Sequence, residues 1–347
     1  MDRVKLRWIL VAVLAAVLVR LPAITTLPLD SDEPIYMAAS QEIAEGLRDK
    51  NAELILAPTL NREHPGLVKL LYGLSFVGLG EEPDLIARLA TTRGLSMLAG
   101  LATVGLVAWV HPAAGLALAT HTLHAKYSVQ GYLDSLPLFW MSLAMIVGWR
   151  TRAEADSRGQ ILAAACWGAA VAGKWLHGLP GLVLLVVIPT WRGRLQLAVG
   201  ALISMWILDP GMWMDPLDRV TEMLSAHQAY AGALDTPTHW LDPLRFMVSG
   251  GPAQWHPEAF SWSPDGIWFG LGVAGIVIRY RDSFALFLAA WCATPLLFLM
   301  CWSTRWPQHT MAVIVPVCLG VGLLFDVLVS RASRRFSPTG SDPPTSE

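Results

Sequence analysis

Charged residues are scarce in this chain. They make up 15% of its 347 residues, whereas 54% of the residues are hydrophobic and the mean hydropathy is +0.46. A soluble domain would carry about a quarter charged residues. This low charge excludes an ordinary soluble globular protein, and the long apolar runs predict an all-α protein that crosses a membrane several times.

Cysteine is rare as well, and no block of like charge is present. The four cysteines lie in apolar runs without the spacing of metal ligands, so we interpret them as small buried side chains rather than as a disulfide framework. Redox chemistry is therefore not expected. A net charge of −2 without a basic tail is atypical of nucleic-acid binding. The cysteines are Cys166, Cys292, Cys301 and Cys318.

The first apolar stretch, residues 8–24, sets the orientation of the chain. It is long for the core of a signal peptide and lacks a small-residue cleavage site, so a retained helix is predicted. Arg3, Lys5 and Arg7 precede it, and by the positive-inside rule they place the N-terminus in the cytoplasm. The acidic segment DSDEPIYM, residues 30–37, then lies at the outer surface.

Residues 67–80 are apolar but number only about 14, fewer than the roughly 20 that a crossing helix needs. If this run crossed, every later loop would change sides. The arginine clusters near residues 150, 192, 279 and 331 all fall in the cytoplasm only if it does not cross. We therefore predict a helix that lies on the outer surface, with Lys69 facing the lipid headgroups or a site.

The remaining apolar runs predict nine more spans, which makes about ten helices with both chain ends in the cytoplasm. External loops are expected at 25–93 and 209–265. Residues 330–347, rich in Pro, Ser and Thr towards the end, are predicted to form a disordered cytoplasmic tail. The nine further spans are 94–110, 113–129, 135–149, 161–173, 176–189, 195–208, 266–278, 284–302 and 311–329.

In this topology most ionisable residues other than the cytoplasmic arginines gather at the outer ends of the helices. Ionisable groups at membrane depth are costly and tend to mark a site or a pathway. The pattern therefore predicts a site that faces outward. The residues concerned are Asp32, Glu33, His64, Lys69, Arg88, Arg93, Asp134, Lys174, His177, Asp209, His227, His239, Arg305 and His309.

Five stretches in consistent order resemble the motifs of one family. They are Arg20-Leu21-Pro22 followed by DEPIY (32–36), HPGLVKLL (64–71), RGLSMLAG (93–100), YLDSLPLFW (132–140) and GKWLHGL (173–179). Together they resemble the GT-C membrane glycosyltransferases, closest to the polyprenyl-phosphate-mannose protein O-mannosyltransferases of glycosyltransferase family 39. Gly66 stands where that family has a second proline. The aminoarabinose transferases share much of the same outline, and the match beyond residue 179 is loose.

The resemblance implies a GT-C-type transferase domain over residues 1–329 in the plasma membrane, with its site on the extracytoplasmic side. Its activity would be inverting transfer of a hexose, mannose in the closest relatives, from polyprenyl phosphate to a Ser or Thr hydroxyl of a secreted protein. Transfer to a lipid or a cell-wall glycan is the first alternative. A transporter or flippase and an inactive partner subunit are the others, and a homo- or heterodimer stays open.

By motif position, Asp32 would be the general base that takes the proton of the acceptor hydroxyl, and Glu33 would orient the acceptor or the base. The leaving phosphate needs fixed cations where water is scarce, and Lys69, Arg93, Lys174 and Arg305 are the candidates. His64 and Asp134 are candidates for substrate binding. No glycine-rich nucleotide loop is present, which agrees with a lipid-linked donor.

The same residues also have structural interpretations. The acids near Asp32 could cap a helix that begins at Pro34, and Asp134 could cap another. Lys69 could extend to the headgroups, and Lys174 next to a tryptophan is typical of a membrane interface. No cofactor is required by the expected reaction, although acids this close together could also hold a divalent cation.

Overall fold

The computed structural model describes residues 3–81, 83–152, 157–232 and 239–336, and within these ranges it contains helices and no strand. Two short 3-10 helices lie at Pro210–Met212 and Pro307–Thr310. The α-helices are α1 (Arg3–Thr26), α2 (Asp32–Asp49), α3 (Ala52–Leu56), α4 (Leu67–Val77), α5 (Leu85–Val110), α6 (Pro112–Thr120), α7 (Thr122–Val129), α8 (Ser135–Thr151), α9 (Ser157–Gly173), α10 (Trp175–Gly178), α11 (Gly181–Val187), α12 (Trp191–Leu208), α13 (Pro216–Gly232), α14 (Asp242–Val248), α15 (Gly251–Trp255), α16 (Asp265–Ile278), α17 (Ser283–Cys301) and α18 (Met311–Phe336).

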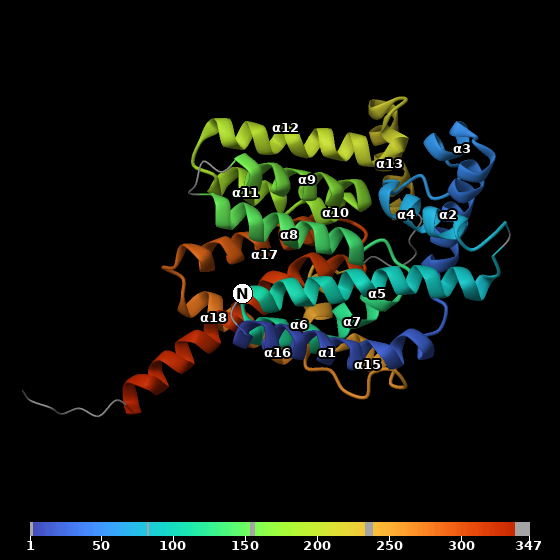
Figure 1. Cartoon of the computed structure of the whole chain (residues 1–347). Coiled ribbons are helices and arrows are strands. Elements are labelled where there is room, and N and C mark those ends of the chain that lie inside the picture. The colour runs from blue at the N-terminus through green and yellow to red at the C-terminus, as the bar shows by residue number, and fades with distance from the viewer. Residues whose placement is uncertain (1–2, 82, 153–156, 233–238, 337–347) are drawn as a thin grey trace, which may run out of the picture.

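The long helices run side by side in one bundle (Figure 1). On α1 the large side chains face outward and the small ones inward. Leu10, Leu14 and Leu18 are 58%, 59% and 64% exposed, whereas Ala12 and Ala16 are buried. Helices in lipid pack through small residues that let their backbones approach closely, and their large apolar residues can face the lipid. The chain therefore has the side-chain distribution of an all-α membrane protein, as its composition predicts.

A helix occupies each of the ten predicted spans, but two of these helices are broken. The predicted span 113–129 is interrupted at His121, where α6 ends and α7 begins. The predicted span 176–189 is divided into α10 and α11, and Pro180 lies at the start of α11. Four helical stretches are long and apolar enough to cross a membrane by themselves: Arg3–Thr26, Leu85–Val110, Ser283–Cys301 and Pro307–Ser333.

Short helices cover one end of the bundle. There α2, α3, α4 and α13 lie beyond the ends of α8, α9 and α12, on the side where α5 starts and opposite the start of α1 and the end of α18 (Figure 1). With 11 residues, α4 is about 16 Å long, too short to cross a bilayer. It packs closely on α2, since a Cβ at Gly73 would lie 2.8 Å from the Ser40 carbonyl oxygen.

One predicted loop contains helices, and one sequence-based boundary is corrected. The external loop 209–265 contains three α-helices in its described part, α13, α14 and α15. The last helix, α18, continues to Phe336, so residues 330–336 are helical rather than a disordered tail. Residues 330–337 contain no proline or glycine, and the first proline after them is Pro338. Helices usually end at or before the residue that precedes a proline. The predicted tail from 337 onward lies outside the described residues.

Candidate active site at the covered end of the bundle

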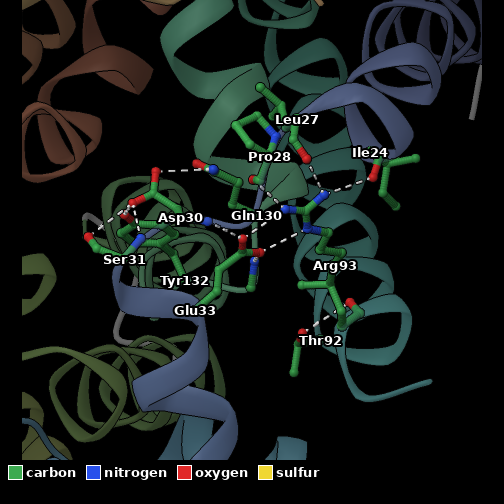
Figure 2. A network of polar contacts seen from close by, with 12 residues as sticks. Ile24, Leu27, Pro28, Asp30, Ser31, Glu33, Thr92, Arg93, Gln130 and Tyr132 are labelled. Carbon is green, nitrogen blue, oxygen red and sulfur yellow. Dashed lines mark hydrogen bonds and ion pairs between the residues drawn. The ribbon is translucent and has the colours of Figure 1, made fainter. Parts of the chain in front are cut away.

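Glu33 and Arg93 form a fully buried ion pair at the start of α2 (Figure 2). Arg93 on α5 donates from Nε and Nη2 to the two Glu33 carboxylate oxygens, at 2.9 and 2.8 Å. Its remaining N–H groups donate to the carbonyls of Ile24, Leu27 and Pro28. A guanidinium has five N–H donors, and all five are used here. Arg93 therefore joins α1, α2 and α5, and it has no donor left for the phosphate that it was expected to bind.

Asp30 precedes α2 and is held by three side chains from distant positions in the chain, in addition to its neighbour Ser31. Tyr132 donates its hydroxyl to Oδ1 at 2.7 Å, while Lys126 and Gln130 each donate to Oδ2 at 3.2 Å. Burial raises the pKa of Asp30, but Lys126 and these hydrogen bonds outweigh burial and leave the pKa below its ordinary value. The Asp30 carboxylate is thus kept ionised in a fixed position next to Asp32.

Asp32, the predicted base, is half-buried and has few partners. Among the described residues its side chain makes two long contacts, with the Tyr36 hydroxyl at 3.3 Å and the Ser31 hydroxyl at 3.4 Å. Burial is the main cause that raises the pKa of Asp32, and the nearby Asp30 carboxylate adds to it against the lowering effect of Lys174. A carboxylate with a raised pKa and few hydrogen-bond partners is suited to take a proton.

Asp134 and Lys174, both candidates, pair with each other. Lys174 Nζ lies 2.9 and 2.8 Å from the two Asp134 oxygens, and His177 Nε2 lies 2.9 Å from one of them. All three side chains are buried. Asp134 is thus the partner of a cation in this geometry, and its expected role as a ligand of the substrate has no support here. An ammonium has three donors, so one N–H of Lys174 is left for a ligand.

A cavity of about 10 Å³, roughly the size of one water molecule, lies beside these groups. Its lining includes Lys174 and three histidines, His64, His227 and His309, together with the rings of Trp175 and Trp302. His64 Nδ1 is buried and has no hydrogen-bond partner among the described residues. Burial and then Lys174 hold the pKa of His64 well below its ordinary value, so the ring is neutral and can donate one N–H.

Asp32 is connected to this cavity through Tyr36. The Tyr36 hydroxyl contacts Asp32, and its ring packs edge-on against His64 with centroids 6.1 Å apart. The cavity therefore places a cation and the N–H donor of His64 together, and Tyr36 links them to a carboxylate of raised pKa. That arrangement suits a ligand with an anionic group at one end and a reacting atom near Asp32.

A second, apolar cavity of about 230 Å³ shares Trp175 and His227 with the first. It lies between α9, α12 and α13. Three methionines line it, and methionine adapts its shape to flexible apolar ligands. Apart from Asp209 and His227, the residues that line this cavity are apolar. The other lining residues are Pro65, Val171, Met205, Asp209, Met212, Val220, Met223 and Leu224.

Lys69 and Arg305 line neither cavity. Lys69 is fully buried, so the expectation that it faces the headgroups is wrong. Its ammonium donates to the carbonyls of Asn61 and His64 at 2.6 and 3.0 Å and holds the loop before α4. Arg305 donates to the carbonyls of Leu299 and Met300 at the end of α17. Their proposed contact with a phosphate has no support in this geometry.

Lys69 should make the stability of the protein depend on pH. Burial lowers its pKa from the ordinary 10.5 to about 7, so between these values the unfolded chain binds more protons than the folded one. We therefore expect the stability of the wild type to rise with pH through this window, relative to Lys69→Met, which carries no titrating group there. Thermal unfolding in detergent at several pH values measures this. Equal pH slopes for the two proteins would contradict it.

The sequence missed the partners of Asp30. Lys126 and Gln130 lie in or just after an apolar run, and a charged residue inside a predicted span is itself a signal of a functional site. In the described part of the chain, no three His, Cys, Asp or Glu side chains are grouped so as to hold a metal ion. A cation bound by the acids of DSDE stays a prediction.

Comparison with known proteins gives structural neighbours only. No protein-family model matches the chain, and no curated protein matches it. ArnT from Cupriavidus metallidurans superposes with a TM-score of 0.64 in its apo state and 0.67 in a structure bound to undecaprenyl phosphate, at 18% identity in both cases. An oligosaccharyltransferase of Archaeoglobus fulgidus gives a TM-score of 0.56 at 13% identity.

Each of these comparisons covers 94% of this chain. The chain spans 61% and 62% of the two ArnT structures and 50% of the oligosaccharyltransferase. At these identities the likeness concerns the arrangement of helices and not the chemistry. The chain therefore has the GT-C fold, which is the fold that its five sequence motifs predict.

Proposed function

We propose that this protein is a membrane glycosyltransferase that takes a sugar from a polyprenyl phosphate and transfers it to a hydroxyl group on the extracytoplasmic face. One observation carries the proposal: a half-buried carboxylate of raised pKa, Asp32, is linked through Tyr36 to a cavity with a lysine and three histidines, and an apolar cavity adjoins that one. A lipid phosphate carries the matching anionic and apolar groups. The ArnT structure with undecaprenyl phosphate concerns a protein of the same fold.

In the proposed reaction the acceptor oxygen attacks the anomeric carbon of the sugar. The new carbon–oxygen bond forms as the bond between the anomeric carbon and the phosphate oxygen breaks, which inverts the configuration. The hydroxyl proton passes to Asp32, and polyprenyl phosphate leaves as an anion. Lys174 and the N–H of His64 would stabilise the charge that develops on that phosphate. Asp134 holds the Lys174 ammonium in place for this task.

The apolar cavity would hold the first part of the prenyl chain. Met223→Trp adds volume at its wall, so we expect the KM for a long-chain donor to rise about tenfold, as displaced apolar contacts of this size predict. The matched control is Met214→Trp on the neighbouring segment, because Met214 is 77% exposed and does not line the cavity. Initial rates at varied donor concentration measure the effect. Identical KM values for the two variants would refute the assignment of the cavity.

The proposal takes mannose as the sugar and a protein Ser or Thr hydroxyl as the acceptor, on the strength of the sequence motifs. To test this, radiolabelled mannose on polyprenyl phosphate is supplied to membranes containing wild type or Asp32→Asn at matched abundance. Label in protein that disappears with Asp32→Asn supports the full proposal, and label in lipid or glycan selects the other acceptor. If no polyprenyl-phosphate sugar that is tried gives any transfer, the proposal that this protein is such an enzyme is wrong.

A further inference from the structure

The break between α6 and α7 lies in the interior of the bundle. His121 has an extended backbone there, with φ −69° and ψ 111°. A break of this kind leaves carbonyl groups at the end of one helix and N–H groups at the start of the next without helical partners. Within a membrane each unsatisfied group costs several kcal/mol, so irregular backbone is tolerated only where the protein itself supplies partners.

Two buried side chains of opposite charge supply these partners. Arg20 on α1 donates to the carbonyl of Ala119 at the end of α6, 2.9 Å away, and its Nε donates to Ser128 on α7. Asp265, the first residue of α16, accepts from the backbone N–H of Thr122 and of Leu123 at 2.7 and 3.1 Å. The cation thus lies at the negative end of α6 and the anion at the positive end of α7, which is the favourable arrangement for both helix dipoles.

The helix that Asp265 caps is eight residues long and entirely buried, and its far end reaches the candidate site. Lys126 in its last turn and Gln130 just after it both donate to Asp30. The next residue, Gly131, donates its N–H to Glu33 at 2.7 Å. Figure 2 shows Gln130 and Tyr132 next to Asp30 and Glu33 at the start of α2.

We propose that Asp265 is a positioning residue: by fixing the start of α7 it sets Lys126 and Gln130 against Asp30, and so fixes the first turn of α2 that carries Asp32. Asp265 acts through α7 and does not touch substrate. Thr122 and Asp265 are 143 positions apart in the chain. The consequence for sugar transfer rests on the proposed function, whereas the placement of Lys126 does not.

The placement is tested without any transfer assay. In the purified protein in detergent, the rate at which Lys126 reacts with an acylating reagent is followed by mass spectrometry, and Lys174, paired separately with Asp134, is the internal reference. We expect Asp265→Ala to raise the labelling of Lys126 about tenfold, the factor expected when a helix loses its cap, and to leave Lys174 unchanged. Asp265→Asn, which keeps one acceptor oxygen, should give a smaller rise. Asp282→Ala, which removes the cap of α17, should give none.

Unchanged labelling of Lys126 in folded Asp265→Ala would overturn the proposal, as would an equal rise at Lys174. If Asp265→Ala does not accumulate, Asp265→Asn decides by the same comparison. In transfer assays, a residue that acts through Lys126 gives non-additive losses, so Asp265→Asn with Lys126→Met should be no slower than the slower single variant. If the losses in transfer rate of the two single variants multiply in the double variant, the two residues act independently and the proposal is wrong. If the wild type shows no transfer, the proposed function is wrong, but the conclusion about the placement of Lys126 still follows from the labelling.

Discussion

Asp32→Asn should lower kcat for sugar transfer by about 10²–10⁴-fold, the usual contribution of a general base, without loss of folded protein. Asp32 is half-buried and makes only two long polar contacts, so an isosteric amide costs little stability. The matched control is Asp49→Asn, because Asp49 is an exposed acid at the other end of α2. Initial rates at equal protein abundance measure both. A rate for Asp32→Asn within tenfold of wild type would exclude Asp32 as the base.

The raised pKa of Asp32 gives this prediction a pH signature. A base must be ionised to accept a proton, so the wild-type rate should fall as the pH is lowered through the raised pKa. The residual rate of Asp32→Asn should lack this acid limb. A pH profile measured from acidic to neutral conditions separates loss of the base from a general loss of activity, which would lower the rate and leave the limb in place.

Glu33→Gln, in contrast to Asp32→Asn, should lower the stability of the protein. Removing one partner of a buried ion pair leaves the other charge uncompensated and typically costs about 3–5 kcal/mol, and Glu33 also accepts the backbone N–H groups of Asp30 and Gly131. Thermal unfolding in detergent should show a much lower midpoint than wild type. Glu45→Gln, an exposed acid of the same helix, should change the stability by no more than about 0.5 kcal/mol.

The pair itself is tested by a double-mutant cycle. If Arg93 and Glu33 stabilise the protein through each other, the double variant Glu33→Gln with Arg93→Met should lose less stability than the sum of the two single variants. Additive losses would show that each residue acts on its own. Together with Asp32→Asn, the cycle assigns separate roles to two adjacent acids. Asp32 is expected to act in the reaction, and Glu33 is expected to hold α2 against α5.

The sequence predicts the helices and the location of the acids well, because both depend on local composition. Apolar runs of sufficient length predict a helix at each of the ten spans, and the GT-C fold suggested by the motifs is confirmed. The break in 113–129 is not visible as composition, because the partners that satisfy its backbone come from distant segments, whereas Pro180 marks the break in 176–189. Arg20 and Asp265 are the example: each is 99 or more positions from the backbone group it binds across the break at His121.

The sequence does not reveal which partner each charged side chain binds. Arg93 and Lys69 were expected at the site as phosphate ligands, and both lie near it. Their partners are Glu33 and loop carbonyls instead, because the choice depends on how the helices are rotated against one another. Lys174, predicted for the same role, does line the small cavity. A sequence can thus indicate that cations gather near acids, but the fold decides which of them is left for a ligand.

Equilibrium binding of undecaprenyl phosphate to the purified protein tests the central claim most directly, because it asks whether the two adjoining cavities accept a lipid phosphate at all. We predict saturable binding that His64→Gln weakens and that Met214→Trp, at an exposed position outside both cavities, leaves unchanged. A prenyl alcohol of equal length, which lacks the phosphate, should bind much more weakly. Equal binding of the alcohol and the phosphate, or no saturable binding of either, would contradict the proposed site.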